Sequence, residues 1–443
     1  MIYINKKYVA FIVGLFSVTQ VRFLGTFAIS EFMIFVTIVY LLLKNPRPFR
    51  AMFQNKRMIV LLVLCFLWMC STFFSDQINE NDLTNSLKGF FGIVPLFFGF
   101  IFFYWLLYDN LSVIYFYILG SAISFVISLF VFVPSALEYT LAASGADSLL
   151  EITELGPRLF AAAIGGFVSI ISFKFYPKHP YIVCMVRLLN SLYALLKGSR
   201  GSFFLGLLIT FILAYFARYS NKRFLNNNLI TSIQKQLPII IVVIIVGGII
   251  AKNIYSYSAE QGYLGDSQKR KYEKQASSKM GLLSGRGEFV SAYLAIKDAP
   301  WFGHGSYPLD ENGYAVEASE LTGDELLSDT YREEYIPTHS HLTGSWVQNG
   351  ILGALFWIYG LYLIFQFLSK YVYICPVYMG YTISASVGAF WNILFSPFSN
   401  RPALGVFFAF IIVMMNHIDR QKKADCNFPE SKNSRISETN KQL

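Results

Sequence analysis

Long apolar runs recur along almost the whole chain, and they constrain its fold more than any other feature. A helix of about 20 apolar residues can cross a bilayer core because it satisfies its own backbone hydrogen bonds. The sequence therefore predicts an all-α polytopic membrane protein with about twelve transmembrane helices. The runs lie near residues 8–21, 24–43, 58–74, 89–107, 112–133, 159–173, 180–196, 202–217, 237–253, 343–367, 371–395 and 402–416.

The composition agrees with a membrane protein and narrows the function classes. Only 14% of the residues are charged and 55% are hydrophobic, whereas soluble domains carry about 25% charged residues. The net charge of +9 does not indicate a nucleic-acid partner, since membrane proteins need Lys and Arg in their cytoplasmic loops. The five cysteines have no CxxC spacing, and no nucleotide-binding glycine loop is present. We expect neither a cofactor nor a bound metal.

The distribution of Lys and Arg predicts the topology. The loops 44–57 and 217–236 are basic, whereas 75–87 and 134–157 are acidic. Because basic loops stay in the cytoplasm, both chain termini should be cytoplasmic. The expected parts are an N-terminal transmembrane bundle of about nine spans (1–253), a large extracytoplasmic loop containing short helices (254–342), C-terminal transmembrane helices (343–416) and a polar cytoplasmic tail (417–443).

Two arginines stand out on the predicted outer face. Arg200 lies in a Gly-Ser-Arg-Gly turn between two spans, where the positive-inside pattern makes an arginine unexpected. Arg286 lies at the start of a predicted helix that ends near Pro300, with Ser284 as a candidate N-cap. A cation there opposes the helix dipole, but an arginine beside free helix N–H groups suits a phosphate group. Snorkelling is the alternative for Arg200.

Three of the five histidines lie near the end of the outer loop. His339 and His341 precede the span 343–367, and His304 is the other histidine of this loop. A structural metal site usually needs about four ligands, so metal binding is disfavoured. A histidine that is neutral near pH 7 can instead act as a general base. The residues alone leave open whether His339 or His341 takes that role.

Other charges lie inside or beside the apolar runs. Glu31 and Arg187 fall within predicted spans, and such intramembrane charges are costly and often functional. Arg158 and Arg401 flank outer helix ends and can add positive charge to an outer cavity.

These stretches together resemble the O-antigen ligase and polymerase superfamily of bacterial cell-surface polysaccharide assembly. The resemblance rests on residues 199–201 (Ser-Arg-Gly), 284–286 (Ser-Gly-Arg), 300–305 (Pro-Trp-Phe-Gly-His-Gly), and His339 ahead of 350–353 (Gly-Ile-Leu-Gly). It covers about 195–368, and the earlier spans fit only in hydropathy. The family often has Asn after the histidine, where this chain has Ser340.

The resemblance implies a metal-independent membrane glycosyltransferase of the bacterial cytoplasmic (inner) membrane. Its donor would be an undecaprenyl-pyrophosphate-linked glycan, and its acceptor a second lipid-linked glycan or lipid A-core. His339 would be the base, and Arg200 and Arg286 would hold the pyrophosphate. A flippase and a chain-length regulator would be its protein partners. The candidate substrate-binding residues are His341, His304, Arg158, Arg187 and Arg401.

Two alternatives stay open at this point. We favour a polymerase of O-antigen repeat units, because the large, aromatic and charge-partitioned outer loop suits two glycan chains, but a ligase also has two substrates. A transporter or flippase is the alternative from another class. A transporter should show repeat symmetry and midplane charges, whereas this chain concentrates its candidate groups at the outer face.

Overall fold

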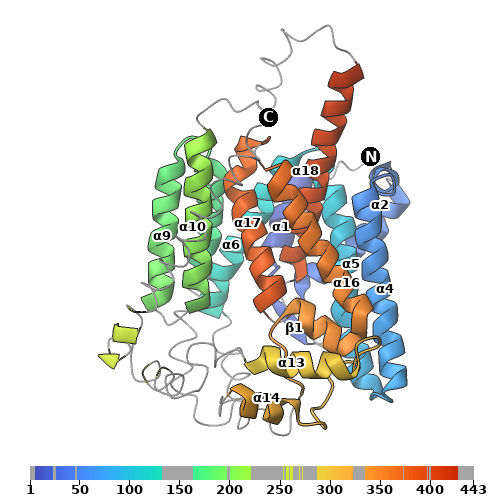
Figure 1. The fold of residues 1–443 in the computed structure, drawn as a ribbon. Helices are drawn as coiled ribbons and strands as arrows, with labels where there is room; N and C mark the ends of the chain where they lie inside the picture. Colours follow the sequence, from blue (N-terminus) through green and yellow to red (C-terminus); the bar gives the residue numbers. More distant parts are fainter. Residues whose placement is uncertain are drawn as a thin grey trace.

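A computed structural model describes most of the chain as a bundle of helices (Figure 1). The described residues are 5–22, 26–44, 47–131, 163–196, 200–220, 287–322, 335–372, 374–396, 398 and 401–427, with isolated positions between 253 and 272. The N-terminal helices are α1 (Lys6–Leu15), α2 (Ile29–Lys44), α3 (Arg47–Met52), α4 (Lys56–Ile78), α5 (Leu83–Leu107), α6 (Ile114–Val131), α9 (Pro180–Leu196) and α10 (Arg200–Ser220). The later helices are α13 (Gly287–Asp298), α14 (Tyr314–Thr322), α16 (His341–Lys370), α17 (Pro376–Phe395) and α18 (Arg401–Asn427).

The all-α membrane class is supported, but the number of twelve spans is not. Among the described residues, four helices are long and apolar enough to cross a membrane: α4, α5, α16 and α18. Seven more predicted runs contain helix that is shorter or less apolar, and nearly all of 237–253 lies outside the described residues. The short helices α13 and α14 lie within the predicted outer loop, as expected.

The first two predicted spans differ from the structure at their junction. Helix α1 ends at Leu15, and an antiparallel hairpin of β1 (Gln20–Arg22) and β2 (Thr26–Ala28) follows before α2. The apolar runs 8–21 and 24–43 are therefore not two continuous helices. Hydropathy alone does not separate an apolar strand from the end of an apolar helix, which is why the runs gave no sign of the hairpin.

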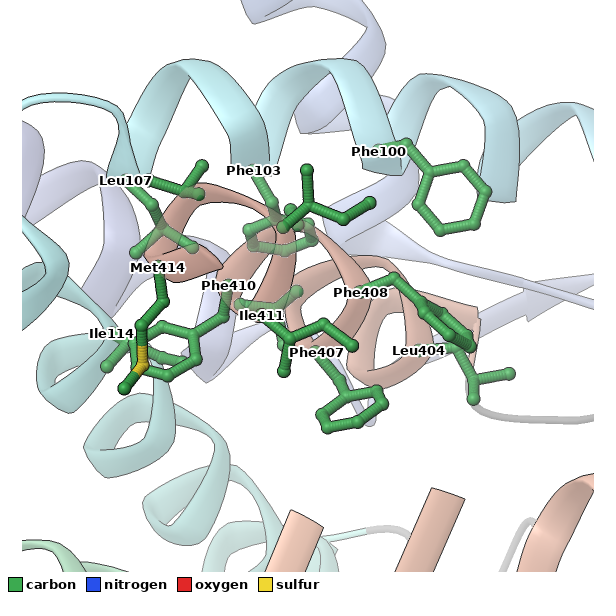
Figure 2. Close-up of a cluster of buried hydrophobic side chains, with 14 of the residues drawn as sticks. Phe100, Phe103, Leu107, Ile114, Leu404, Phe407, Phe408, Phe410, Ile411 and Met414 are labelled. Carbon is green, nitrogen blue, oxygen red and sulfur yellow. The ribbon is translucent and has the colours of Figure 1, made fainter. Parts of the chain in front are cut away.

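Helix α18 forms the centre of the bundle. Of its most apolar stretch, 78% is buried, and its Phe408 ring packs edge-on against Phe100 of α5, with the ring centroids 6.2 Å apart (Figure 2). Gly99 of α5 and Gly405 of α18 lie close together at this crossing, since a Cβ added to Gly405 would be 3.4 Å from the Gly99 carbonyl carbon. Small residues let membrane helices approach this closely.

Polar contacts mark the end of the bundle from which α18 emerges. Arg57 Nη1 donates to Asp419 Oδ2 at 2.9 Å, and Lys6 Nζ forms an ion pair with Asp109 at 2.6 Å. Helices α13 and α14 lie at the opposite end (Figure 1). The polar contacts and the two short helices thus mark opposite ends of the bundle, and which end faces the cytoplasm stays a prediction.

The predicted cytoplasmic tail is partly helical. Helix α18 continues beyond residue 416 to Asn427. Ile418 is buried, and Asp419 binds both Arg57 and the Tyr371 hydroxyl. These contacts give the first residues of the polar extension fixed partners, and the cytoplasmic location of the tail stays a prediction.

A sharp break divides α16 into two helical segments. Gly350 has φ 65° and ψ −159°, a conformation essentially restricted to glycine. The segment before the break folds back on the segment after it, because Ser345 Oγ accepts a 2.8 Å bond from Trp357 Nε1 twelve residues later. The segment 341–349 is called the half-helix below. The predicted span 343–367 is therefore not one straight helix.

Residues 300–305 of the outer loop form backbone hydrogen bonds with the residues at this break. The backbone amides of His304 and Gly305 donate to the carbonyls of Val347 (2.7 Å) and Gln348 (3.0 Å). The Ile351 amide donates to the Trp301 carbonyl at 3.3 Å. Residues 300–305 and the break at 347–351 are together called the backbone lock. For Gly350 of the Gly-Ile-Leu-Gly motif, the close neighbour is this loop.

Substituting Gly350 tests the lock. A Cβ at Gly350 would overlap the Trp301 carbonyl oxygen and would require a strained φ, so Gly350→Ala should lower the free energy of unfolding by about 2–4 kcal/mol. The measurement is the thermal unfolding midpoint of the purified protein in detergent.

The matched control is Gly388→Ala in α17. Nothing lies within 4 Å of a Cβ added to Gly388, and its φ is ordinary. Alanine there should be neutral or stabilising by up to about 1 kcal/mol, because alanine favours helix. Equal midpoints for the two variants would contradict the lock.

Candidate active site

The end of the bundle that carries α13 and α14 holds a histidine–glutamate pair. His339 Nδ1 lies 2.9 Å from Glu288 Oε2. The His339 side chain is 45% exposed, whereas that of Glu288 is 17% exposed. Glu288 lies in the first turn of α13, where the helix dipole stabilises a carboxylate. The partly exposed His339 imidazole is thus held by the more buried carboxylate of Glu288.

This pairing suits a general base. A neutral His339 that donates its Nδ1 proton to Glu288 presents its basic lone pair at Nε2. The carboxylate also stabilises the imidazolium that forms when Nε2 takes a proton. Sequence reasoning missed Glu288, although an acidic residue two positions after Arg286 in a helix first turn was a usable signal.

His341 has a different environment. It is 2% exposed, and its ring packs edge-on against Trp357 and Phe398. Its Nδ1 lies 2.7 Å from the carbonyl oxygen of Ser396, so this nitrogen carries the proton. Its Nε2 is buried and has no hydrogen-bond partner among the described residues. This geometry favours His339 over His341 as the histidine that meets substrate.

A row of aromatic rings links the start of α10 to the start of α13. Gly201, next to Arg200, lies near Trp391 of α17. The rings of Trp391 and Phe395 are 4.8 Å apart, and Phe395 is 5.9 Å from Phe289, the neighbour of Glu288.

The positions of the two candidate arginines, Arg200 and Arg286, are known only from the described residues next to them in the chain. Arg200 is the first residue of α10, but its side chain is outside the described part. Arg286 also lies outside the described residues, as does its proposed cap Ser284, and Gly287 begins α13.

One predicted intramembrane charge, Glu31, forms an ion pair with Arg401, which was predicted to flank a helix end. Arg401 Nε and Nη2 donate to the two oxygens of Glu31 at 2.8 and 3.0 Å. The Arg401 guanidinium also lies over the Phe27 ring, and its Nη1 is 3.3 Å from the Gly92 carbonyl. Arg401 thus has a structural role as the ion-pair partner of Glu31, and a contact with substrate would be a second role.

Arg187 lies within α9, away from the outer end of that helix. It is buried, and its Nε donates to Ser172 Oγ at 2.9 Å. Nine residues separate it from Leu196, which corresponds to about 13 Å along a helix. Arg158 lies outside the described residues.

His304 holds the outer loop together. Its Nε2 lies 2.8 Å from the Ala295 carbonyl, and its ring packs edge-on against Tyr314. Burial raises the pKa of the Tyr314 phenol to about 12, so this hydroxyl stays protonated and donates to Asp298. The contacts tie α13 to α14 and indicate a structural role for His304.

No metal-binding cluster occurs in the part of the chain that the structure describes. There, no group of three or more His, Cys, Asp or Glu side chains is arranged to hold an ion.

Comparison with known proteins points to one family. Residues 185–358 match the family model described as O-antigen ligase. No curated protein sequence matches the chain significantly. The matched region contains most of α9, all of α10, the described outer loop, the His339–Glu288 pair and the backbone lock. The match thus supports the resemblance of residues 185–358 of this integral membrane protein to the O-antigen ligase and polymerase superfamily.

Proposed function

We propose that this protein polymerises undecaprenyl-pyrophosphate-linked oligosaccharide repeat units at the outer leaflet of the bacterial cytoplasmic membrane. The observation that carries the proposal is the His339–Glu288 pair at the end of the bundle that holds the outer loop. A membrane site next to a protein loop suits a reaction between two lipid-anchored glycans. The family match supports the general class of reaction.

The proposed reaction is a glycosyl transfer with His339 as base. The acceptor hydroxyl oxygen attacks the anomeric carbon of the donor sugar, and its proton passes to His339 Nε2. The bond between the anomeric carbon and the phosphate oxygen breaks, and its electron pair stays on the lipid pyrophosphate. Glu288 keeps the imidazole oriented and balances its positive charge.

The leaving pyrophosphate gains negative charge as the bond breaks. Arg200 and Arg286 are the proposed groups that stabilise it, since guanidinium groups stay charged and bind phosphate oxygens in a bidentate manner. The row of rings from Trp391 to Phe289 supports this assignment, because it joins the helix that begins at Arg200 to the helix that follows Arg286. His341 and Arg401 would contribute by holding the surrounding helices.

The second candidate function is O-antigen ligation. The description of the matching family favours it. A ligase would use the same donor and the same base but would transfer a finished glycan to lipid A-core.

Removing the base tests the catalytic assignment. His339→Ala should lower product formation by about 10²–10⁴-fold, the usual contribution of a general base, and should leave the protein in the membrane. The measurement is polymer formation from purified lipid-linked repeat units. The control is His179→Ala, an exposed histidine between the helix 163–175 and α9. Wild-type product from the His339 variant would refute the assignment.

Neutralising Glu288 tests the pairing. Glu288→Gln removes a charge-assisted hydrogen bond worth about 1.5–3 kcal/mol, so the turnover rate should fall by about 10–100-fold. The KM for acceptor should change little, because Glu288 acts through His339. The measurement is the separate determination of kcat and KM. The control is Glu317→Gln, an exposed carboxylate of α14, which should behave like the wild type.

A deletion strain discriminates polymerase from ligase. Loss of a polymerase should leave cell-surface glycans that carry single repeat units. Loss of a ligase should leave lipid-linked polymer and bare acceptor core. Gel analysis of surface polysaccharide and of the lipid-linked fraction measures both, and the second pattern would overturn the polymerase proposal while keeping the glycosyl transfer.

A further inference from the structure

The length of α4 sets the depth of the backbone lock relative to the bilayer. Arg57 in the first turn of α4 binds Asp419, and Asn79 caps the other end of the helix. The 22 residue steps between them correspond to about 33 Å at 1.5 Å each. A bilayer hydrocarbon core is about 30 Å thick. Asn79 therefore lies at the boundary between the hydrocarbon core and the headgroups.

The backbone lock is attached to this boundary. Asn79 Nδ2 donates to the Gly303 carbonyl at 3.1 Å, and Ser75 Oγ, one turn earlier, donates to the Gln348 carbonyl at 2.8 Å. Trp301 and Phe302 precede Gly303 directly. Both residues are consequently held near the level of the last turn of α4.

Trp301 and Phe302 are strongly exposed at this level. The exposed fraction is 69% for Trp301 and 55% for Phe302. The last turns of α4 also expose Phe73, Phe74 and Ile78, which as side chains of a membrane span face lipid. The outer loop thus exposes apolar side chains at about the same depth as the exposed apolar side chains in the last turns of the span. Tryptophan in particular favours the membrane–water interface, because its ring is amphipathic.

We propose that Trp301 and Phe302 insert into the outer interface of the bilayer and anchor the outer loop to the lipid surface. The partner is the lipid headgroup and upper acyl-chain region. The anchor is rigidly connected to the site. The Trp301 carbonyl accepts from the Ile351 amide, and the Pro300 carbonyl accepts from Trp346 Nε1 of the half-helix. The half-helix begins two residues after His339, so lipid contact at Trp301 would fix the height of His339 above the membrane.

Depth-dependent fluorescence quenching tests the anchor. The full-length protein and its Trp301→Tyr variant are placed in phosphatidylcholine nanodiscs, and the emission lost on substitution is assigned to Trp301. We expect most of this emission to be quenched by lipids brominated near the headgroup end of the acyl chains. Aqueous iodide should quench it only weakly.

A matched control supplies the aqueous reference. Leu321 is an exposed apolar residue of α14, which packs on α13 at the end of the molecule (Figure 1). Leu321→Trp in the Trp301→Tyr background should be quenched by iodide and not by brominated lipid.

Two results would overturn the proposal. If Trp301 emission is quenched by iodide and not by brominated lipid, as expected for the control, Trp301 lies in water. Emission protected from both quenchers would show that protein covers Trp301. Quenching requires no turnover, so either result leaves the proposed glycosyl transfer untouched.

Discussion

The break in α16 at Gly350 is the constraint on which the outer half of the structure depends. A broken helix leaves backbone carbonyls without their intrahelical donors, and in a bilayer each unsatisfied group costs several kcal/mol. The carbonyls of Val347 and Gln348 are satisfied by the amides of His304 and Gly305. The Asn349 carbonyl accepts from Ser71 Oγ of α4 at 2.6 Å. The outer loop is therefore fixed to the bundle because the helix is broken.

This arrangement explains the spacing of the sequence motifs in physical terms. Gly303 and Gly305 have φ of 75° and 85°, and a Cβ on Gly303 would lie 2.7 Å from the backbone of Gln348. The Asp76 carboxylate reinforces the contact, because it is buried and accepts bonds from the amide and hydroxyl of Ser306. The Pro-Trp-Phe-Gly-His-Gly and Gly-Ile-Leu-Gly segments are two halves of one backbone contact. The fold therefore requires both segments, whether or not they contact substrate.

The sequence was sufficient for the membrane class and for most helix positions, and the family resemblance singled out His339, whose catalytic role stays a prediction. Those features depend on local hydropathy or on short motifs. The break at Gly350 was not predictable, because a glycine in an apolar helix indicates close packing as readily as a bend. Its hydrogen-bond partners on α4 lie more than 270 positions earlier in the chain. The two residues of the Arg401–Glu31 pair are 370 positions apart in the chain. The pairing of Glu288 with His339 depends on the tertiary packing that places α13 beside His339.

The positions of the two histidines show why a buried and an exposed imidazole can stand one residue apart. Ser340, between them, caps the half-helix by accepting from the Thr343 amide, and its hydroxyl donates to the Ile393 carbonyl of α17. The backbone at Ser340 is extended, with φ −145° and ψ 140°. In extended backbone, neighbouring side chains alternate in direction, but the helix begins at His341 and turns that side chain into the bundle. His339 stays outside the helix and meets Glu288. The cap at Ser340 thus turns the His341 imidazole into the packed interior and leaves the His339 imidazole at the surface beside Glu288.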